Sequence, residues 1–203
     1  MIQSDENSTI DIWAQVPDTL IVRIRHPRIL PDAEDSLTFH AARLLILLNF
    51  SGDPKTKSIE GRTKLAKMDF LIRYPTYLAE AARLKNVKTT ITPSIKPESR
   101  MIRYKYGPWD ERYYDIFAYL VAKDLVEITP SKTKGDIFKL TRKGEAAVDE
   151  LTGSEFEELI TRCQLVYKLF GKSTGTTIKR FIYHYFTDII DKPLGAEIEG
   201  ADA

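Results

Sequence analysis

The residues whose types could carry chemistry most directly are Gly171, Lys172 and Ser173, which match the end of a phosphate-binding loop. Such a loop requires the pattern Gly-x-x-x-x-Gly-Lys-Ser/Thr between a buried strand and a helix. Val166 stands where the first glycine should be, and the residues before Gly171 have helical spacing. The glycine is therefore predicted to end one helix, with Ser173 or Thr174 capping the next. We favour a joint between two helices. The alternative is a nucleotide-using enzyme, in which Lys172→Ala would abolish nucleotide affinity.

Other catalytic and metal-binding patterns are weak. The histidines are His26, His40 and His184, and only His184 has a candidate co-ligand one helical turn away, Asp188. Two ligands without a third make a poor metal site. Cys163, the one cysteine, lies on the apolar side of a predicted helix and is expected to be a small buried thiol. The sequence thus predicts no catalytic residue, no cofactor and no metal site.

Composition limits the class of protein. The chain has 203 residues, 43% of them hydrophobic, which suffices for one sizeable core or two small ones. No apolar run approaches the roughly 18 residues that a membrane helix needs, so no membrane contact is expected. The acidic start of the chain is unlike a signal peptide, and a single cysteine suits a reducing compartment. We therefore expect a cytoplasmic protein.

Positive charge is concentrated in the middle of the chain. Residues 54–106 carry 13 lysines and arginines against 4 acidic residues, although the formal net charge of the whole chain is only +1. Cations gathered on one face favour contact with nucleic-acid phosphates, whereas a solvated helix face or an acidic partner protein is the alternative. The candidate DNA-binding residues are Arg62, Lys64, Lys67, Arg73, Arg100, Arg103, Lys105, Lys132 and Lys134.

Aromatic residues crowd positions 104–114. Tyrosine and tryptophan are the residues that most often anchor protein interfaces, although many also belong to cores. A chain with no catalytic set and this many aromatic residues is expected to work by docking. The candidate partner interface consists of Tyr104, Tyr106, Trp109, Tyr113 and Tyr114.

Four segments are expected along the chain. Residues 1–34 form an N-terminal extension with a short strand at 20–25, and residues 35–98 form a helical, basic region like a helix-turn-helix. Residues 99–152 form a winged-helix segment, with a strand at 101–109, a helix from about Asp110 and a wing of two strands joined by a basic turn. Residues 153–203 form a helical hairpin with a loose, acidic tail. The fold class is thus mainly α with small β, with winged-helix domains, a β-hairpin wing and additional packed helices.

Helical spacing assigns faces within the first two predicted helices. In the helix that Asp35 or Ser36 caps, Leu37 and four later apolar residues, Ala41, Leu44, Leu45 and Leu48, fall on one side. The next helix, at about 61–73, should turn Leu65, Met68, Leu71 and Ile72 inward and Arg62, Lys64 and Lys67 outward. Pro75 should interrupt it, because proline lacks an amide hydrogen and clashes with the preceding turn.

Three sequence segments resemble a known family, the middle component of three-component ABC-ATPase systems in bacterial defence operons, which include the Lamassu type. The segments are GRTKLAKMDFLIRYP at 61–75, YKYGPWDERYYDIFAYLVAKDLVEI at 104–128 and FKLTRKGEAAVDEL at 138–151, and the likeness covers about residues 44–189. The first motif is fairly specific, whereas KLTRKG after a hairpin occurs in many winged-helix families. The resemblance implies a small non-catalytic subunit that works with an SMC-like ATPase and an effector, often a nuclease. It carries no residue-level functional set to this chain.

Two hypotheses follow from these patterns. The first is an accessory subunit that bridges an SMC-like ABC ATPase and an effector nuclease in defence against phages or plasmids, and that can also contact the backbone of double-stranded DNA. The second is a stand-alone winged-helix transcription regulator, in which the helix from Asp110 or the one from Gly61 enters the major groove. A regulator should bind duplex DNA by itself with a steep salt dependence, whereas the subunit should bind weakly alone.

Overall fold

The computed structural model describes residues 36–94 and 97–200. The predicted N-terminal extension at 1–34, with its strand, lies outside the described residues, and so does His26. The described residues all belong to one compact unit of the chain, Ala33–Ala203.

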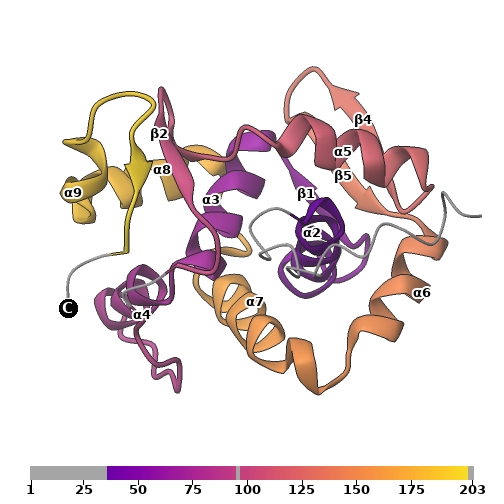
Figure 1. Ribbon diagram of the computed structural model, residues 1–203, viewed down its shortest axis with the longest axis horizontal. Helices are drawn as coiled ribbons and strands as arrows, with labels where there is room; N and C mark the ends of the chain where they lie inside the picture. The colour runs from indigo at the N-terminus through magenta and orange to yellow at the C-terminus, as the bar shows by residue number, and fades with distance from the viewer. Residues whose placement is uncertain (1–35, 95–96, 201–203) are drawn as a thin grey trace, which may run out of the picture. The chain divides into compact units, whose positions relative to one another are not determined.

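The described chain is mainly helical and carries two small antiparallel sheets of three strands each (Figure 1). The helices are α2 (Leu37–Ser51), α3 (Arg62–Arg73), α4 (Pro75–Leu84), α5 (Tyr113–Ala122), α6 (Arg142–Leu151), α7 (Glu157–Phe170), α8 (Gly175–Tyr185) and the short α9 (Thr187–Ile190). One sheet has the order β1-β5-β4, from β1 (Ser58–Glu60), β4 (Val126–Ser131) and β5 (Gly135–Leu140). The other has the order β3-β2-β6, from β2 (Met101–Tyr104), β3 (Gly107–Trp109) and β6 (Glu197–Ile198). The prediction of a mainly helical protein with small β structure is confirmed.

Local chemistry explains where α2 begins and where α3 is separated from α4. Ser36, rather than Asp35, caps α2, because its side chain accepts a hydrogen bond from the backbone N–H of Phe39 at 3.2 Å. Pro75 separates α3 from α4 as predicted, and stands at the first turn of α4, where a missing N–H costs nothing.

The segment Gly171–Thr174 joins two helices. Helix α7 ends at Phe170, and the side chain of Thr174 caps α8 by accepting a hydrogen bond from the N–H of Thr177 at 3.1 Å. The residues before Gly171 are therefore helical, not the buried strand that a phosphate-binding loop follows. The predicted helix–helix joint is confirmed.

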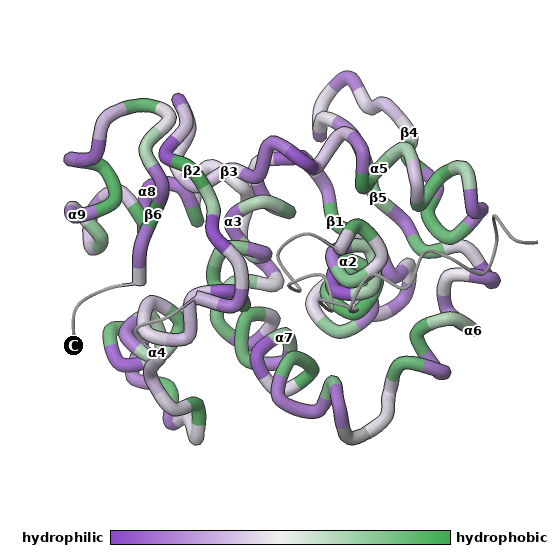
Figure 2. The backbone as a smooth tube through the Cα atoms, in the orientation of Figure 1, coloured by the Kyte–Doolittle hydropathy of each residue, from purple (hydrophilic) through white to green (hydrophobic). Residues whose placement is uncertain are grey.

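Helix α2 is the centre of the hydrophobic core, where it packs against α5, α6 and α7. It is apolar along much of its length (Figure 2), and Ile46 and Leu47 are as fully buried as Leu44. The prediction of a single inward face is too narrow, because neighbours cover α2 on several sides. Leu37, expected to face inward, is exposed at the first turn.

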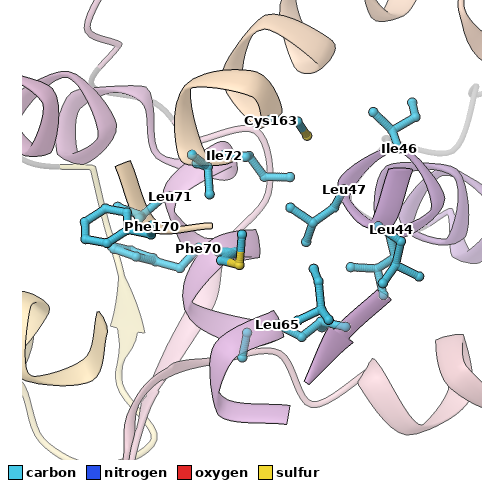
Figure 3. Close-up of a cluster of buried hydrophobic side chains, with 14 of the residues drawn as sticks. Leu44, Ile46, Leu47, Leu65, Phe70, Leu71, Ile72, Cys163 and Phe170 are labelled. Carbon is cyan, nitrogen blue, oxygen red and sulfur yellow. The ribbon is translucent and has the colours of Figure 1, made fainter. Parts of the chain in front are cut away.

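Apolar side chains from α2, α3 and α7 meet in one cluster. Figure 3 shows Leu44 and Leu47 of α2, Leu65 and Ile72 of α3, and Cys163 of α7 gathered there. Burial raises the pKa of the Cys163 thiol, so this residue is the buried thiol that the sequence predicts.

A buried carboxylate lies beside this apolar core. Arg43 Nε of α2 donates to Asp69 Oδ1 of α3 at 2.8 Å, and Arg73 Nε lies 3.1 Å from Asp69 Oδ2. The Tyr113 hydroxyl of α5 donates to the same Oδ2 at 2.7 Å. Burial alone would raise the pKa of Asp69, but the two guanidinium groups outweigh it and hold the pKa below the ordinary value. Asp69 thereby joins α2, α3 and α5.

Arg73 also pairs with Asp110, which extends this ionic network to the end of the β2–β3 hairpin. Its Nη2 donates to Asp110 Oδ2 at 2.5 Å, directly after β3. Asp110 Oδ1 also accepts from the backbone N–H and from Nε of Arg112, both at 2.9 Å. Burial would raise the pKa of Asp110, yet Arg73 and Arg112 together lower it. Asp110 was predicted to cap a helix, but α5 begins at Tyr113 with Arg112 as its N-cap, and the Asp110 carboxylate pairs with Arg73 and Arg112.

Two predictions, the single strand at 101–109 and the loose C-terminal tail, need correction. The segment 101–109 is a hairpin rather than one strand, because Gly107 adopts a φ of +95° and turns the chain between β2 and β3. The C-terminal segment is not loose as far as it is described: β6 pairs with β2, Ile198 is fully buried, and its carbonyl accepts a hydrogen bond from the Tyr74 hydroxyl at 2.7 Å.

The Asp69 carboxylate should be indispensable for stability. Asp69→Ala leaves Arg43 and Arg73 buried without their shared partner, so we expect the free energy of unfolding to fall by about 3–5 kcal/mol. Urea denaturation at neutral pH measures this change. Asp149→Ala, on the exposed side of α6, is the matched control and should change stability by less than about 0.5 kcal/mol. Equal stability of the two variants would contradict the role given to Asp69.

Candidate nucleic-acid and docking surface

Two of the predicted DNA-binding residues are buried. Lys67 is 1% exposed, and its Nζ donates a hydrogen bond to the carbonyl of Pro108 in β3 at 2.7 Å. Arg73 is fully buried in the ionic network with Asp69 and Asp110. The prediction that these two side chains contact phosphate is wrong. The β2–β3 hairpin covers Lys67, which helical spacing assigned to the solvent side of α3.

Several other predicted cations are held by acidic side chains or by the backbone. Lys134 at the tip of the β4–β5 hairpin pairs with Glu60 at 2.8 Å, and Arg100 pairs with Glu197 at 2.5 Å. Lys64 is half-buried and donates to the Gly171 carbonyl at 2.7 Å. Arg62 pairs with Asp136, and Arg103 donates to the Tyr104 carbonyl. Lys105 and Lys132 are exposed.

These pairs alter the expected surface charge. An ion pair at the surface still offers a cation to a phosphate, but the acidic partner next to it weakens the local positive potential. The basic block of the sequence is therefore less basic at the surface than its residue count indicates. The DNA-binding role of the exposed members stays a prediction.

The Gly-Lys-Ser stretch lines a wide cleft. The cleft has a volume of about 1270 Å³ and lies between the loop after α2, the start of α3, the tip of the β4–β5 hairpin and the joint before α8. Five cations line it, Lys55, Arg62, Lys64, Lys134 and Lys172, and so do three acidic residues, Asp53, Glu60 and Asp136. Arg62 pairs with Asp136 and Lys134 pairs with Glu60, so part of the positive charge of the cleft is already neutralised.

An aromatic pocket lies at the β2–β3 hairpin, and we call it the hairpin pocket. Its volume is about 470 Å³, within the range of ligand sites, and its main lining side chains are Tyr104, Tyr106, Trp109, Tyr114, Lys67 and Arg62. The sequence placed four of these residues in one candidate interface and two in the DNA-binding set. The fold brings the two sets together.

The Trp109 ring of the hairpin pocket packs against the buried ring of Tyr113. Trp109 packs edge-on against Tyr113, with ring centroids 4.9 Å apart and planes at 76°. Tyr113 is fully buried, so its predicted place in a partner interface is wrong: its ring is core and its hydroxyl binds Asp69. Burial also raises the pKa of Tyr113. Tyr104, Tyr106 and Tyr114 keep between 49% and 59% of their surface exposed.

Helix α8 contributes one cation, Lys179, that the sequence analysis missed. Lys179 Nζ lies 5.0 Å from the ring centroid of Tyr106 and 5.2 Å from that of Tyr183. The Tyr183 hydroxyl donates to the carbonyl of Lys105 at 3.1 Å, which ties α8 to the turn of the hairpin. The available signal was the spacing of Lys179 and Tyr183, one helical turn apart, but nothing in the sequence placed that turn beside Tyr106.

Lys67 lies at the inner end of the hairpin pocket in an unfavourable setting for a cation. Its burial, with Lys179 and Arg103 nearby, lowers its pKa from 10.5 to about 7. Gly107 makes this close packing feasible, since a Cβ atom there would lie 3.2 Å from Lys67 Cε. Lys67 is thus a structural lysine whose charge depends on pH near neutrality.

No protein-family model matches the chain, and searches of curated proteins and of solved structures find no match. Among the described residues, no group of three or more histidine, cysteine, aspartate or glutamate side chains is arranged to hold a metal ion. None of the helices in the described part of the chain combines the length and apolar character needed to cross a bilayer.

Lys67 should make stability depend on pH. Below about pH 7 the folded chain holds an ammonium group in a site that disfavours it. Between pH 7 and 10.5 the folded chain releases a proton that the unfolded chain keeps, so stability rises with pH. Lys67→Met removes this contribution. Relative to that variant, the wild type should gain up to about 1 kcal/mol per pH unit between pH 7 and 9.

Urea unfolding at pH 6, 7, 8 and 9 measures this difference. Lys139→Met, which removes an exposed lysine from β5, is the matched control and should run parallel to the wild type. A Lys67→Met curve parallel to that of the wild type would show that Lys67 keeps an ordinary pKa.

Proposed function

We propose that the chain is a non-catalytic accessory subunit that bridges an SMC-like ABC ATPase and an effector, a nuclease, in defence against phages or plasmids. The resemblance of the segments 61–75, 104–128 and 138–151 supplies the class of partner. The exposed side chains of α5 support a role in docking to a protein partner.

The topology supports a winged-helix interpretation. The order α2, β1, α3, α5, β4, β5, with β1 paired to β5 and β5 to β4, is the order of helices and strands in winged-helix domains. Residues 74–112, which include α4 and the β2–β3 hairpin, are then an insertion between the second and third helices. In this interpretation α5 stands where DNA-binding relatives carry a recognition helix.

The exposed face of α5 is the observation that carries the proposal. The helix contains no lysine, arginine, asparagine or glutamine, and its exposed side presents Tyr114, Asp115, Ala118 and Val121. A recognition helix needs donors for base edges and phosphates, whereas an apolar face with an aromatic residue suits a protein partner. Val121 and Tyr114 are 48% and 59% exposed and lie two turns apart on that face. The α5 face is therefore the proposed docking surface for the ATPase.

The transcription regulator remains the second candidate. Exposed Lys132 at the tip of the β4–β5 hairpin favours it, since a wing can contact the DNA backbone beside a recognition helix. The acidic residue on α5 disfavours it, because Asp115 would face the phosphates.

Co-expression with the genes that flank its own, followed by affinity capture of this chain, tests the docking surface. We expect a long coiled-coil ATPase to be retained by the wild type. Val121→Glu places a charge at the C-terminal end of the α5 face and should reduce the retained ATPase at least about tenfold, as loss of an interface anchor does. Leu194→Glu alters an exposed apolar residue in the α9–β6 connection and should retain the ATPase fully. Retention by both variants would remove α5 from the interface.

Duplex DNA distinguishes the two candidates. The isolated subunit should bind any duplex with a Kd of about 10⁻⁶ M or weaker at physiological salt, in the range of non-specific contacts. A regulator would reach about 10⁻⁸ M or tighter on its operator. Selection of duplexes from a random-sequence pool, followed by titration at two salt concentrations, measures this. Enrichment of one tight-binding sequence without any ATPase would contradict the proposed function.

A further inference from the structure

The hairpin pocket concentrates exposed aromatic surface in the described part of the chain. Tyr104, Tyr106 and Tyr114 keep 51%, 49% and 59% of their surface exposed around one opening of about 470 Å³. Half-exposed rings on a rigid support usually have something to cover them, because their apolar faces gain free energy when removed from water. Trp109, fixed edge-on against Tyr113, provides that support.

Cations flank the exposed rings. Lys105 Nζ lies 5.6 Å and Lys179 Nζ 5.0 Å from the ring centroid of Tyr106. The Arg62 guanidinium lies 5.7 Å from the ring centroid of Tyr114. Among the described residues that line the pocket, Glu111 is the one acid.

This charge pattern selects the ligand. An aromatic cage for methylated lysine or arginine works poorly when cations of the protein already lie beside its rings, because like charges repel. Here the rim repels a cationic ligand and attracts an anionic one. A planar, apolar group with a negative charge next to it satisfies both the rings and the rim, and an unstacked base with its phosphate has this chemistry.

We propose that the hairpin pocket binds unstacked bases of a single-stranded nucleic acid, with Tyr104, Tyr106 and Trp109 as the stacking surface and Lys105 and Lys179 on the phosphates. A duplex cannot use this site in the same way, because its base faces are stacked inside the helix and only its phosphates reach the rim. In this proposal Tyr104 and Tyr106 contact nucleic acid instead of a protein partner, and the α5 face remains the docking surface for the ATPase. It does not rest on the proposed function, since the isolated chain contains the whole pocket.

Fluorescence anisotropy with a labelled twelve-nucleotide oligothymidylate tests the proposal on the isolated full chain. Three further ligands accompany it: an abasic strand with the same phosphates, a duplex of twelve base pairs, and thymidine monophosphate as competitor. At low salt the oligothymidylate should bind at least about tenfold more tightly than the abasic strand, because stacked bases supply the difference. The duplex should bind more weakly than the single strand, and the mononucleotide should compete poorly.

Matched variants locate the binding. The double variant Tyr104→Ala/Tyr106→Ala should weaken oligothymidylate binding about tenfold or more, with little effect on the abasic strand. Tyr185→Ala removes a tyrosine of equal exposure, 49%, that does not line the pocket, and should bind like the wild type. Lys105→Glu should weaken binding of both strands, whereas Lys139→Glu on β5 should have little effect.

Four outcomes would overturn the proposal. Equal affinity for the oligothymidylate and the abasic strand would mean that only the phosphates are bound. Tighter binding of the duplex would favour the transcription regulator. Efficient competition by the mononucleotide would make this a site for free nucleotides. Unchanged oligothymidylate affinity in the double variant would exclude the pocket, and if that variant also lost the ATPase, the hairpin would be a protein interface. The four binding outcomes are measured on the isolated chain and do not depend on whether the ATPase is found, so failure of the proposed function is recognised separately.

Discussion

The Asp69 carboxylate is the interaction on which the rest of the structure depends. It is fully buried on α3, and it contacts Arg43 on α2, Arg73 on α3 and Tyr113 on α5. A buried carboxylate is tolerated only when such partners surround it, so these elements can pack in few other ways. Apolar side chains alone would have left the packing angle of α2, α3 and α5 less defined, because hydrophobic burial is not directional.

The same network determines the position of the candidate surface. Arg73 holds Asp110 at the end of the β2–β3 hairpin, and Lys67 holds the carbonyl of Pro108 one strand position before Trp109. The hairpin is thus attached to α3 by two buried basic side chains, while Tyr104 and Tyr106 stay exposed and Trp109 packs against Tyr113. Charges that the sequence presents as part of a basic block serve partly as internal attachments. For this reason the surface is less basic than the residue count indicates.

Two neighbouring surfaces of different character result. The α5 face exposes apolar and acidic side chains and suits a protein, whereas the hairpin pocket exposes rings bordered by lysine and arginine and suits an anion with a planar group. Tyr114 lies at the boundary, on α5 and in the lining of the pocket. In the proposed function, the two surfaces together would place a nucleic-acid strand next to the ATPase.

The sequence by itself determined features that depend on neighbours within a few residues: a helix cap at Asp35 or Ser36, the break at Pro75, the joint at Gly171–Thr174 and the β4–β5 hairpin. From helical spacing it predicted the burial of Cys163. It also indicated Tyr104, Tyr106, Trp109 and Lys105 as residues of interest. Tertiary structure alone decided that Lys67, Arg73 and Tyr113 are buried, that β6 completes a sheet with β2, and that Lys179 lies beside Tyr106. Helical periodicity reports which residues share a face, but it does not report how many partners cover the helix. The β2–β3 hairpin begins 28 residues after the end of α3, and α8 lies further along the chain. No local pattern could therefore predict that the hairpin contacts α3 or that Lys179 of α8 lies beside Tyr106.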